Sequence, residues 1–321
     1  MKAVRAIACI AVSACALSAS VARGAAGDYP QKPVRLVVPA APGGGLDIMG
    51  RLMAQDLYSQ WHQTVVADNR PGAGVMIGTE LVSKAPPDGY TALVVNANLA
   101  SNAILQNKLD VVKHLSGVGL VATLPNALSV APVLPAHTMK EFIAYAKAKP
   151  LTFGTAGIGV LGHLCGEMLK LSTGIDMVHV PYKGGGPVMA ALAAGEVNVG
   201  IVSLASSVPH MKSGRVRILG VTGLKRSPSA PDIPAIAETV PGFDMDGWIG
   251  FLMPAGTPRP VIAAFNAALQ KSIAREDMRQ KLASQGFDAQ GGTPQAFDAL
   301  IRNDVTKYTK IITKAHISAS R

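Results

Sequence analysis

The chain has 321 residues, of which 49% are hydrophobic, 16% charged and 5% aromatic, and its formal net charge is +10. This length and composition allow one large or two smaller α/β domains with a buried core. The basic residues are scattered and few aromatic residues accompany them, so the pattern does not indicate nucleic-acid binding. The excess positive charge hints at an anionic ligand or an acidic partner.

Residues 1–26 have the features of a secretory signal peptide. A short basic segment precedes the apolar residues 6–17, and small residues at Ala22 and Ala26 offer cleavage sites. No run of about 18 apolar residues occurs elsewhere, so we expect an exported, soluble protein. Cys15 ends a loose match to a lipobox, but we expect an ordinary cysteine of the apolar segment there rather than a lipid anchor.

From residue 34 onward, short apolar runs typical of strands alternate with longer periodic segments typical of helices. Strands are expected at 34–39, 64–69, 90–97, 117–132, 151–156, 176–182, 196–203, 216–223 and 247–254. Helices are expected at 47–60, 77–85, 139–148, 161–172, 187–194 and 258–275, with a further helical tail after 293. This alternation predicts an α/β fold with mainly parallel sheets and helices on both faces.

Two of the expected strands do not fit a simple alternation. The segment 117–132 is long and holds Pro125, which disfavours a central strand throughout. The segment 247–254 follows a proline-rich connection. We interpret both as strands that cross between two lobes and form a hinge. The expected division is 28–127 plus 250–321 for lobe one and 128–249 for lobe two.

Two glycine-rich loops each stand between an expected strand and an expected helix. The first is Pro42-Gly43-Gly44-Gly45, and the second runs Thr155-Ala156-Gly157-Ile158-Gly159-Val160. Such a loop exposes backbone N–H groups beside a helix N-terminus, where anions bind. We therefore expect two similar lobes that hold one anionic ligand between the loops. For Asp47, which opens the first helix, we favour compensation of the helix dipole over ligand contact, and both roles stay open.

Other motifs in the chain suggest chemistry that the surrounding residues do not support. The segment 157–162 matches G-x-G-x-x-G, but Asp176 precedes the next strand instead of ending it, as a dinucleotide fold requires. His163 and Glu167 share a helix face without a third ligand, so we expect a local hydrogen bond rather than a metal site. Cys165 is two residues from His163 and faces elsewhere. We expect no catalytic residue, no cofactor and no metal.

Four segments in this order resemble the Bug family, the extracytoplasmic solute receptors of tripartite tricarboxylate transporters. They are YPQKPVRLVVPAAPGGGLDIMGRLMAQDL, VVADNRPGAGVMIGTELVSKAPPDGYTALV, GTAGIGVLGHLCGEMLKLSTGIDMVHVPYKGGGPVMAALAAGEVNVGI, and RSPSAPDIPAIAE followed by GWIGFLMPAGTP. The resemblance implies a two-lobed, type II periplasmic binding protein-like fold that closes on a small carboxylate in the periplasm. It also implies integral membrane transporter subunits as partners, and we expect a monomer.

The resemblance and the loops together define the expected site. Backbone amides of both glycine loops would hold a carboxylate, with Tyr182 and Thr155 as side-chain donors. The candidate ligand-binding residues are Pro42, Gly43, Gly44, Gly45, Asp47, Asn98, Thr155, Ala156, Gly157, Ile158, Gly159, Val160, His163, Tyr182, Lys183, Gly184, Val202 and Ser203.

The chain departs from the family pattern at several polar positions. Leu46 and Val160 stand where family members usually carry Ser or Thr, and acidic or aromatic positions are taken by Asn198, Ile201 and Val202. Each lost hydroxyl removes a hydrogen bond worth roughly 0.5–1.5 kcal/mol net. We expect a ligand less charged and more apolar than citrate, such as an aromatic or short-chain monocarboxylate. The alternative is that these positions lie away from the ligand.

Two further functions remain open for the chain. A receptor with the same fold can pass its signal to a sensor kinase instead of delivering a solute for transport. An exported hydrolase or an oxidoreductase that uses the G-x-G-x-x-G loop is the enzyme alternative. Turnover, a bound cofactor or an activated nucleophile would favour the enzyme.

Overall fold

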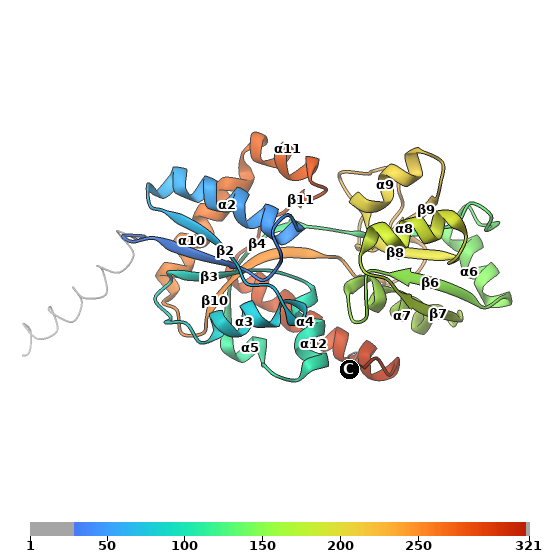
Figure 1. Cartoon of the computed structure of the whole chain (residues 1–321), viewed down its shortest axis with the longest axis horizontal. Helices are drawn as coiled ribbons and strands as arrows, with labels where there is room; N and C mark the ends of the chain where they lie inside the picture. The colour runs from blue at the N-terminus through green and yellow to red at the C-terminus, as the bar shows by residue number, and fades with distance from the viewer. Residues whose placement is uncertain (1–28, 319–321) are drawn as a thin grey trace, which may run out of the picture.

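The computed structural model describes residues 29–318, so the expected signal peptide and the lipobox match lie outside the described residues. The described chain forms an α/β protein of two lobes side by side, each built on its own sheet (Figure 1). No helix within residues 29–318 is both long enough and apolar enough to cross a membrane.

The first lobe, blue to teal and orange to red in Figure 1, is built on a six-stranded sheet of order β11-β4-β10-β3-β1-β2. Its strands are β1 (Val34–Val38), β2 (Val65–Asn69), β3 (Thr91–Asn96), β4 (Leu115–Thr123), β10 (Trp248–Pro254) and β11 (Asp288–Ala289). Its helices are α2 (Gly45–Trp61), α3 (Met76–Ser83), α4 (Asn98–Gln106), α5 (Val111–His114), α10 (Arg259–Ala274), α11 (Glu276–Ser284) and α12 (Pro294–Lys314), with a 3₁₀ turn η1 (Ala73–Val75).

The second lobe, green to yellow in Figure 1, is built on a five-stranded sheet of order β7-β6-β8-β5-β9. Its strands are β5 (Asn126–Val130), β6 (Leu151–Thr155), β7 (Met177–Pro181), β8 (Val199–Ser203) and β9 (Arg217–Val221). Its helices are α6 (Met139–Ala148), α7 (Leu161–Thr173), α8 (Gly185–Ala194) and α9 (Leu204–Lys212), with a 3₁₀ turn η2 (Ile236–Glu238).

The chain passes between the sheets at two places. The segment expected as one crossing strand, 117–132, is instead two strands in different sheets, β4 and β5, separated at Leu124-Pro125. Proline has no backbone N–H to donate to a ladder, which accounts for the break. On the return, β10 begins at Trp248. The first change of sheet, at Pro125, comes two residues before the expected end of the first part of lobe one at 127. The second, at Gly247, comes two residues before the expected end of lobe two at 249.

Each sheet is mixed because the strand next to a crossing point runs against both of its neighbours. β10 is antiparallel to β3 and β4, and β5 is antiparallel to β8 and β9. The short edge strand β11 is also antiparallel to β4, and the pairs β1–β2, β1–β3, β6–β7 and β6–β8 are parallel. Most strands of each sheet still point the same way, so the carboxyl ends of β3, β6 and β8 can face one region.

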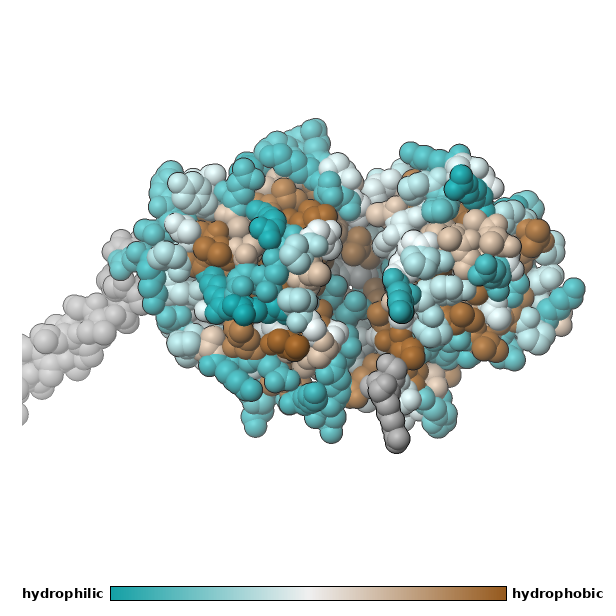
Figure 2. Space-filling view, viewed as in Figure 1, coloured by the Kyte–Doolittle hydropathy of each residue, from teal (hydrophilic) through white to brown (hydrophobic). Residues whose placement is uncertain are grey.

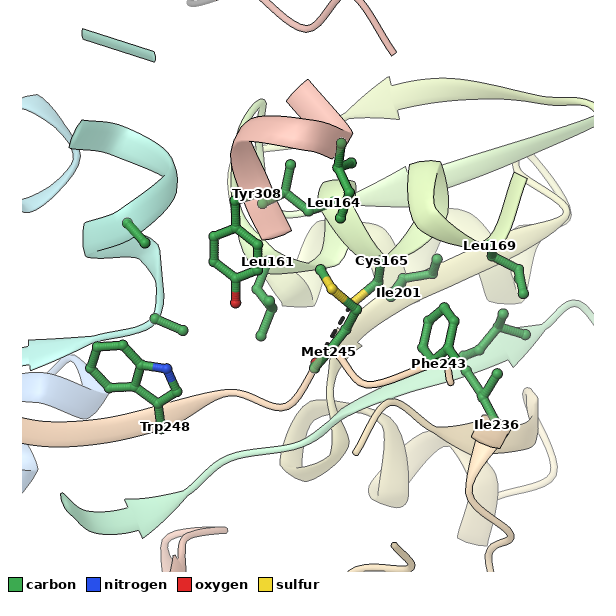
Figure 3. Packing of buried hydrophobic residues seen from close by; sticks show 14 of the residues in the cluster. Leu161, Leu164, Cys165, Leu169, Ile201, Ile236, Phe243, Met245, Trp248 and Tyr308 are labelled. Carbon is green, nitrogen blue, oxygen red and sulfur yellow. Dashed lines mark hydrogen bonds between the residues drawn. The ribbon is translucent and has the colours of Figure 1, made fainter. Parts of the chain in front are cut away.

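A continuous apolar core joins the lobes behind the crossing strands. One buried cluster includes Val95 of the first lobe and Phe153 of the second. Figure 3 shows part of this cluster, with Cys165 of α7 beside Met245 and with Tyr308 of α12 and Trp248 of β10 farther toward the first lobe. Each such buried side chain contributes roughly 1.5–3 kcal/mol. The lobes thus share a packed hinge.

Candidate functional site

A cavity of about 210 Å³ lies between the lobes, where Figure 2 shows a hollow. It is formed by the carboxyl ends of strands and the helix starts that follow them, together with the two crossing segments. The lining residues are Asn96, Ala97, Asn98, Leu124, Asn126, Ala156, Val160, Leu161, Gly162, Gly185, Ile201, Val202, Ser203, Ser206, Gly247 and Trp248.

Four helix N-termini meet at this cavity: those of α4 from the first lobe, and of α7, α8 and α9 from the second. The residues before α4, α7 and α8, which are Ala97, Val160 and Gly184, provide no side-chain cap. Only α9 is capped, by Ser203. The first N–H groups of a helix lack partners within it and carry a partial positive charge. The cavity is therefore suited to an anion.

Among residues 29–318, the lining contains no Asp, Glu, Lys, Arg or His. An anion there would meet backbone N–H groups and neutral side chains, with no acidic side chain of these residues to repel it. Amide and hydroxyl groups come from Asn96, Asn98, Asn126, Ser203 and Ser206. The rest of the surface is largely apolar, so the cavity offers a few polar contacts within an apolar wall, as small-molecule sites commonly do.

One hydrogen bond joins the two lobes across the cavity. The N–H of Leu161, in the first turn of α7, donates to Oδ1 of Asn98 in α4 at 3.1 Å. Asn98 thus fills a capping role for a helix of the other lobe. The start of α4 therefore stands opposite the second glycine loop, where we expected the first glycine loop.

Hydrogen bonds with nearby side chains fix the conformation of the second glycine loop, residues 155–160. The hydroxyl of Thr155 donates to the carbonyl of Gly157 at 2.9 Å and lies 2.7 Å from Nε2 of His179. The N–H of Gly159 donates to Nδ1 of His163 at 3.1 Å. Gly157 and Gly159 have φ values of 140° and 74°, which suit glycine and few other residues. Ala156 and Val160 of this loop reach the cavity.

His163 and His179 form a stacked pair, with ring centroids 3.7 Å apart. Burial lowers the pKa of His163 to about 3, with the neighbouring His179 and Lys170 adding to the shift. Burial, with Lys170, lowers the pKa of His179 to about 4. Both rings are therefore neutral near pH 7, and Nδ1 of His163 is free to accept from the loop.

The hydrogen bond expected between His163 and Glu167 is not formed. The nearest atoms are 4.0 Å apart, beyond hydrogen-bonding distance, and Glu167 pairs with Lys170 at 3.1 Å. Within residues 29–318, no group of three or more His, Cys, Asp or Glu side chains is placed to hold a metal ion.

The first glycine loop, residues 42–45, is exposed and does not line the cavity. The buried carboxylate of Asp47 accepts the N–H of Gly43 at 2.9 Å, Nε of Arg51 at 3.0 Å and Nδ2 of Asn69 at 2.9 Å. The hydrogen bond from Arg51 is the main cause that lowers the pKa of Asp47 to about 2. These hydrogen bonds show that the carboxylate of Asp47 stabilises the first glycine loop and its surroundings.

Of the expected ligand-binding residues, those that line the cavity are Asn98, Ala156, Val160, Val202 and Ser203. Thr155, Gly157, Ile158, Gly159 and His163 form and support the second loop. Tyr182 donates its N–H to the carbonyl of Thr155 at 2.9 Å, and Lys183 and Gly184 follow it in the loop before α8. These three residues do not belong to the lining.

The residues that sequence reasoning missed come mainly from the start of α4 and the crossing segments. Asn96 and Ala97 belong to a strand end, and Leu124, Asn126 and Gly247 to the crossings. The sequence signal for the start of α4 was the polar segment Asn96-Ala97-Asn98, which begins at the last residue of the apolar strand β3. The further missed residues are Leu161, Gly162, Gly185 and Ser206.

The departures from the family pattern fall into two groups. Val160, Ile201 and Val202 line the cavity. Leu46 is buried away from it. Asn198 accepts the N–H of Thr152 at 2.9 Å through Oδ1 and is likewise outside the lining. Only the first group can alter the surface that a ligand meets.

The fold and the cavity are those of a two-lobed solute-binding protein. Residues 49–317 match the family described as Tripartite tricarboxylate transporter family receptor, and the chain belongs to that family, which is one of solute-binding receptors. Its relatives include the proteins BugT and BugD, which confirms the predicted resemblance to the Bug family.

Three similar proteins illustrate the relationship. The protein BugT of Bordetella pertussis is 31% identical over 88% of this chain and 89% of its own length. The structure "R. palustris Rpa4515 with adipate" is 32% identical, covers 91% of this chain and 99% of its own, and has a TM-score of 0.75. A TctC solute-binding protein from Polaromonas is 26% identical, covers 89% and 99%, and has a TM-score of 0.81.

Proposed function

We propose that this protein captures a small carboxylate in the periplasm and delivers it to the membrane subunits of a tripartite tricarboxylate-type transporter. The observation that carries the proposal is the meeting of four helix N-termini at a cavity without an acidic side chain. Membership of a receptor family and the relative with adipate support the same ligand class.

The ligand has at least one carboxylate and an apolar remainder. The carboxylate accepts from the N–H groups at the starts of α7 and α8, and the apolar part lies against Val160, Ile201 and Val202. A cavity of about 210 Å³ is smaller than the 300–1,000 Å³ typical of drug-sized ligands. The apolar wall at Val160, Ile201 and Val202 favours a monocarboxylate or a slim dicarboxylate over citrate, and a cavity of this size does not suit a dinucleotide.

Binding favours closure of the lobes because the ligand contacts both of them. Groups of the first lobe, at Asn96 and Asn98, and of the second, at Val160 and Ser203, line the same cavity. A ligand that touches both sets binds the closed form more tightly and shifts the population toward it. The membrane subunits would then receive the closed form.

The test is a thermal-shift series on the mature protein with monocarboxylates, dicarboxylates including adipate, tricarboxylates, amino acids and NAD. A ligand at about 100 times its dissociation constant adds about 2.7 kcal/mol to the free energy of unfolding. We expect a rise in melting temperature with monocarboxylates or slim dicarboxylates and none with NAD. A rise with citrate above all others would overturn the ligand class, and a rise with NAD alone would overturn the receptor function.

A further inference from the structure

A second groove lies on the surface where α12 runs beside α7, away from the ligand cavity. It has a volume of about 410 Å³ and shares no lining residue with the cavity. Its apolar floor is formed by Met168, Leu171 and Ile311, and the α12 side adds Asn303, Thr306, Lys307, Lys310 and Lys314. Leu171 is 48% exposed, which is high for a leucine in a lobe with a well-packed core.

Three lysines stand on the α12 side of this groove. Lys307, Lys310 and Lys314 are three and four residues apart, a spacing that places them on one face of the helix. Lys307 is engaged, since it donates to the carbonyl of Asp244 at 2.7 Å and lies 3.3 Å from Asp304. Lys310 and Lys314 are exposed, and neither forms an ion pair within the described part of the chain.

No acidic side chain on either helix offsets this charge at the groove. Residues 305–321 contain no Asp or Glu. On α7, the carboxylate of Glu167 is buried and pairs with Lys170. Asp304 is also buried and accepts the indole N–H of Trp248 at 2.7 Å. The helix dipole favours a lysine in the last turn, and this accounts for Lys314. It does not account for Lys310, which lies one turn earlier beside an exposed apolar floor.

We propose that this groove docks an acidic amphipathic segment of the membrane transporter. The proposal rests on the proposed function for the identity of its partner. A segment with apolar side chains three or four residues apart fills the floor, and acidic side chains beside them meet Lys310 and Lys314. A concave groove with an apolar floor matches a peptide better than a lipid surface, which would require a flat basic face.

The direct test uses a synthetic amphipathic helical peptide that carries Glu beside its Leu face, with a Gln-substituted peptide as its uncharged match. Its affinity for the mature protein is measured by fluorescence anisotropy. The variant is Lys310→Glu/Lys314→Glu. The control is Lys140→Glu/Lys147→Glu on α6, which changes the net charge equally at exposed lysines of another helix, one of them also in a last turn. Vesicles of phosphatidylcholine with phosphatidylglycerol test the lipid alternative.

We expect the Glu peptide to bind the unmodified protein and the control variant alike. Its affinity should fall by about 10-fold or more for Lys310→Glu/Lys314→Glu, for the Gln peptide and at high salt, because close charge pairs set this contact. The proposal is overturned if the Glu peptide does not bind, or if both double variants bind it equally. It is also overturned if only vesicles distinguish the two variants.

The same samples separate this proposal from the proposed function. The carboxylate-induced thermal shift should be unchanged in Lys310→Glu/Lys314→Glu, since neither lysine lines the ligand cavity. A normal thermal shift without peptide binding removes the docking groove alone. Peptide binding without any carboxylate shift removes the proposed ligand class alone.

Discussion

The two glycine loops have the same local layout and different surroundings. Both follow a buried strand and precede a helix whose own N-cap residue provides no side-chain cap, Gly44 for α2 and Val160 for α7. The first loop is exposed and is held by the carboxylate of Asp47. The second lies at the interlobe cavity and is held by neutral His163.

The difference supports the proposal that a strand–loop–helix unit supplies an anion site only where other elements complete it. The second loop has the starts of α8 and α9 beside it and the start of α4 opposite. The first loop has its own acidic residue folded back onto the N–H of Gly43. An internal carboxylate there takes the place that an external anion would need.

The largest expected effect comes from placing the same acidic residue at both helix starts. Val160→Asp puts a carboxylate at the cavity, and like-charge repulsion should weaken carboxylate binding by about 100-fold or more. Gly44→Asp is the matched control, since both positions have extended backbone before a helix and Asp is a favourable N-cap. Calorimetry with the carboxylate that gives the largest thermal shift measures both. Equal losses would show that the loops share the ligand.

The second prediction concerns acid sensitivity of the second loop. The pKa values of His163 and His179 in the folded protein, about 3 and about 4, lie below the ordinary value of 6.5. The unfolded chain therefore binds more protons between these values, so the stability from neutral histidine is full above pH 6.5 and is lost as the pH falls. We expect the free energy of unfolding to fall by about 3 kcal/mol between pH 6.5 and 5.

His163→Asn tests the assignment of this slope. Its amide oxygen can still accept the N–H of Gly159 while the titrating group is removed. The slope of unfolding free energy against pH, from denaturant titrations, should be roughly halved. A slope unchanged from that of the unmodified protein would place the acid sensitivity in other groups.

The third prediction concerns the first loop. Asp47→Asn should lower the free energy of unfolding at pH 7 by about 1–2 kcal/mol, because a buried carboxylate with three donors becomes an amide. The pKa of Asp47 is lowered to about 2, so its stabilisation is present above about pH 4 and is lost as the pH falls toward 2. The difference between the two proteins should therefore vanish near pH 2.

The matched control is Asp277→Asn, whose carboxylate is at the surface beside Arg275. It should leave the free energy of unfolding nearly unchanged, because exposed ion pairs contribute little to stability. Carboxylate affinity should stay within twofold of the unmodified value in both variants. A large loss of affinity in Asp47→Asn alone would show that this residue contacts the ligand.

Much of the fold could be predicted from periodicity because strands and long helices carry local signals. The helix expected at 139–148 matches α6 in both bounds, and Thr138 caps it. The helices α4, α5, α9 and α11 were missed, and of these α5 has only four residues. In addition, α4 begins without a side-chain cap and α9 contains Pro209. The break between β4 and β5 could not be predicted from local signals, because it depends on the tertiary structure, in which the two halves of segment 117–132 join different sheets.

The candidate site was less predictable because its lining depends on tertiary contacts. Glycine loops are visible in sequence, but nothing local distinguishes Gly44 from Val160 as a ligand neighbour. The sequence leaves two roles open for Asp47, compensation of the helix dipole and ligand contact, and its hydrogen bonds with Gly43, Arg51 and Asn69 favour the structural role. The start of α4 and the crossing segments enter the site only through the arrangement of the lobes. Likewise, the lysines of α12, scattered in sequence, gather on one face only in the helix.

The smallest expected effect concerns Asn98, which completes the second loop from the other lobe. Asn98→Ala removes the acceptor of the Leu161 N–H, a bond worth roughly 0.5–1.5 kcal/mol net. The unliganded lobes should then separate further, seen as a larger radius of gyration in solution scattering. Asn102→Ala is the control, because Asn102 donates only within α4, to the carbonyl of Asn98. Identical scattering from both variants would show that the bond does not hold the lobes. Carboxylate affinity should change by less than about fivefold, since losing the interlobe bond disfavours closure while freeing one N–H for the ligand.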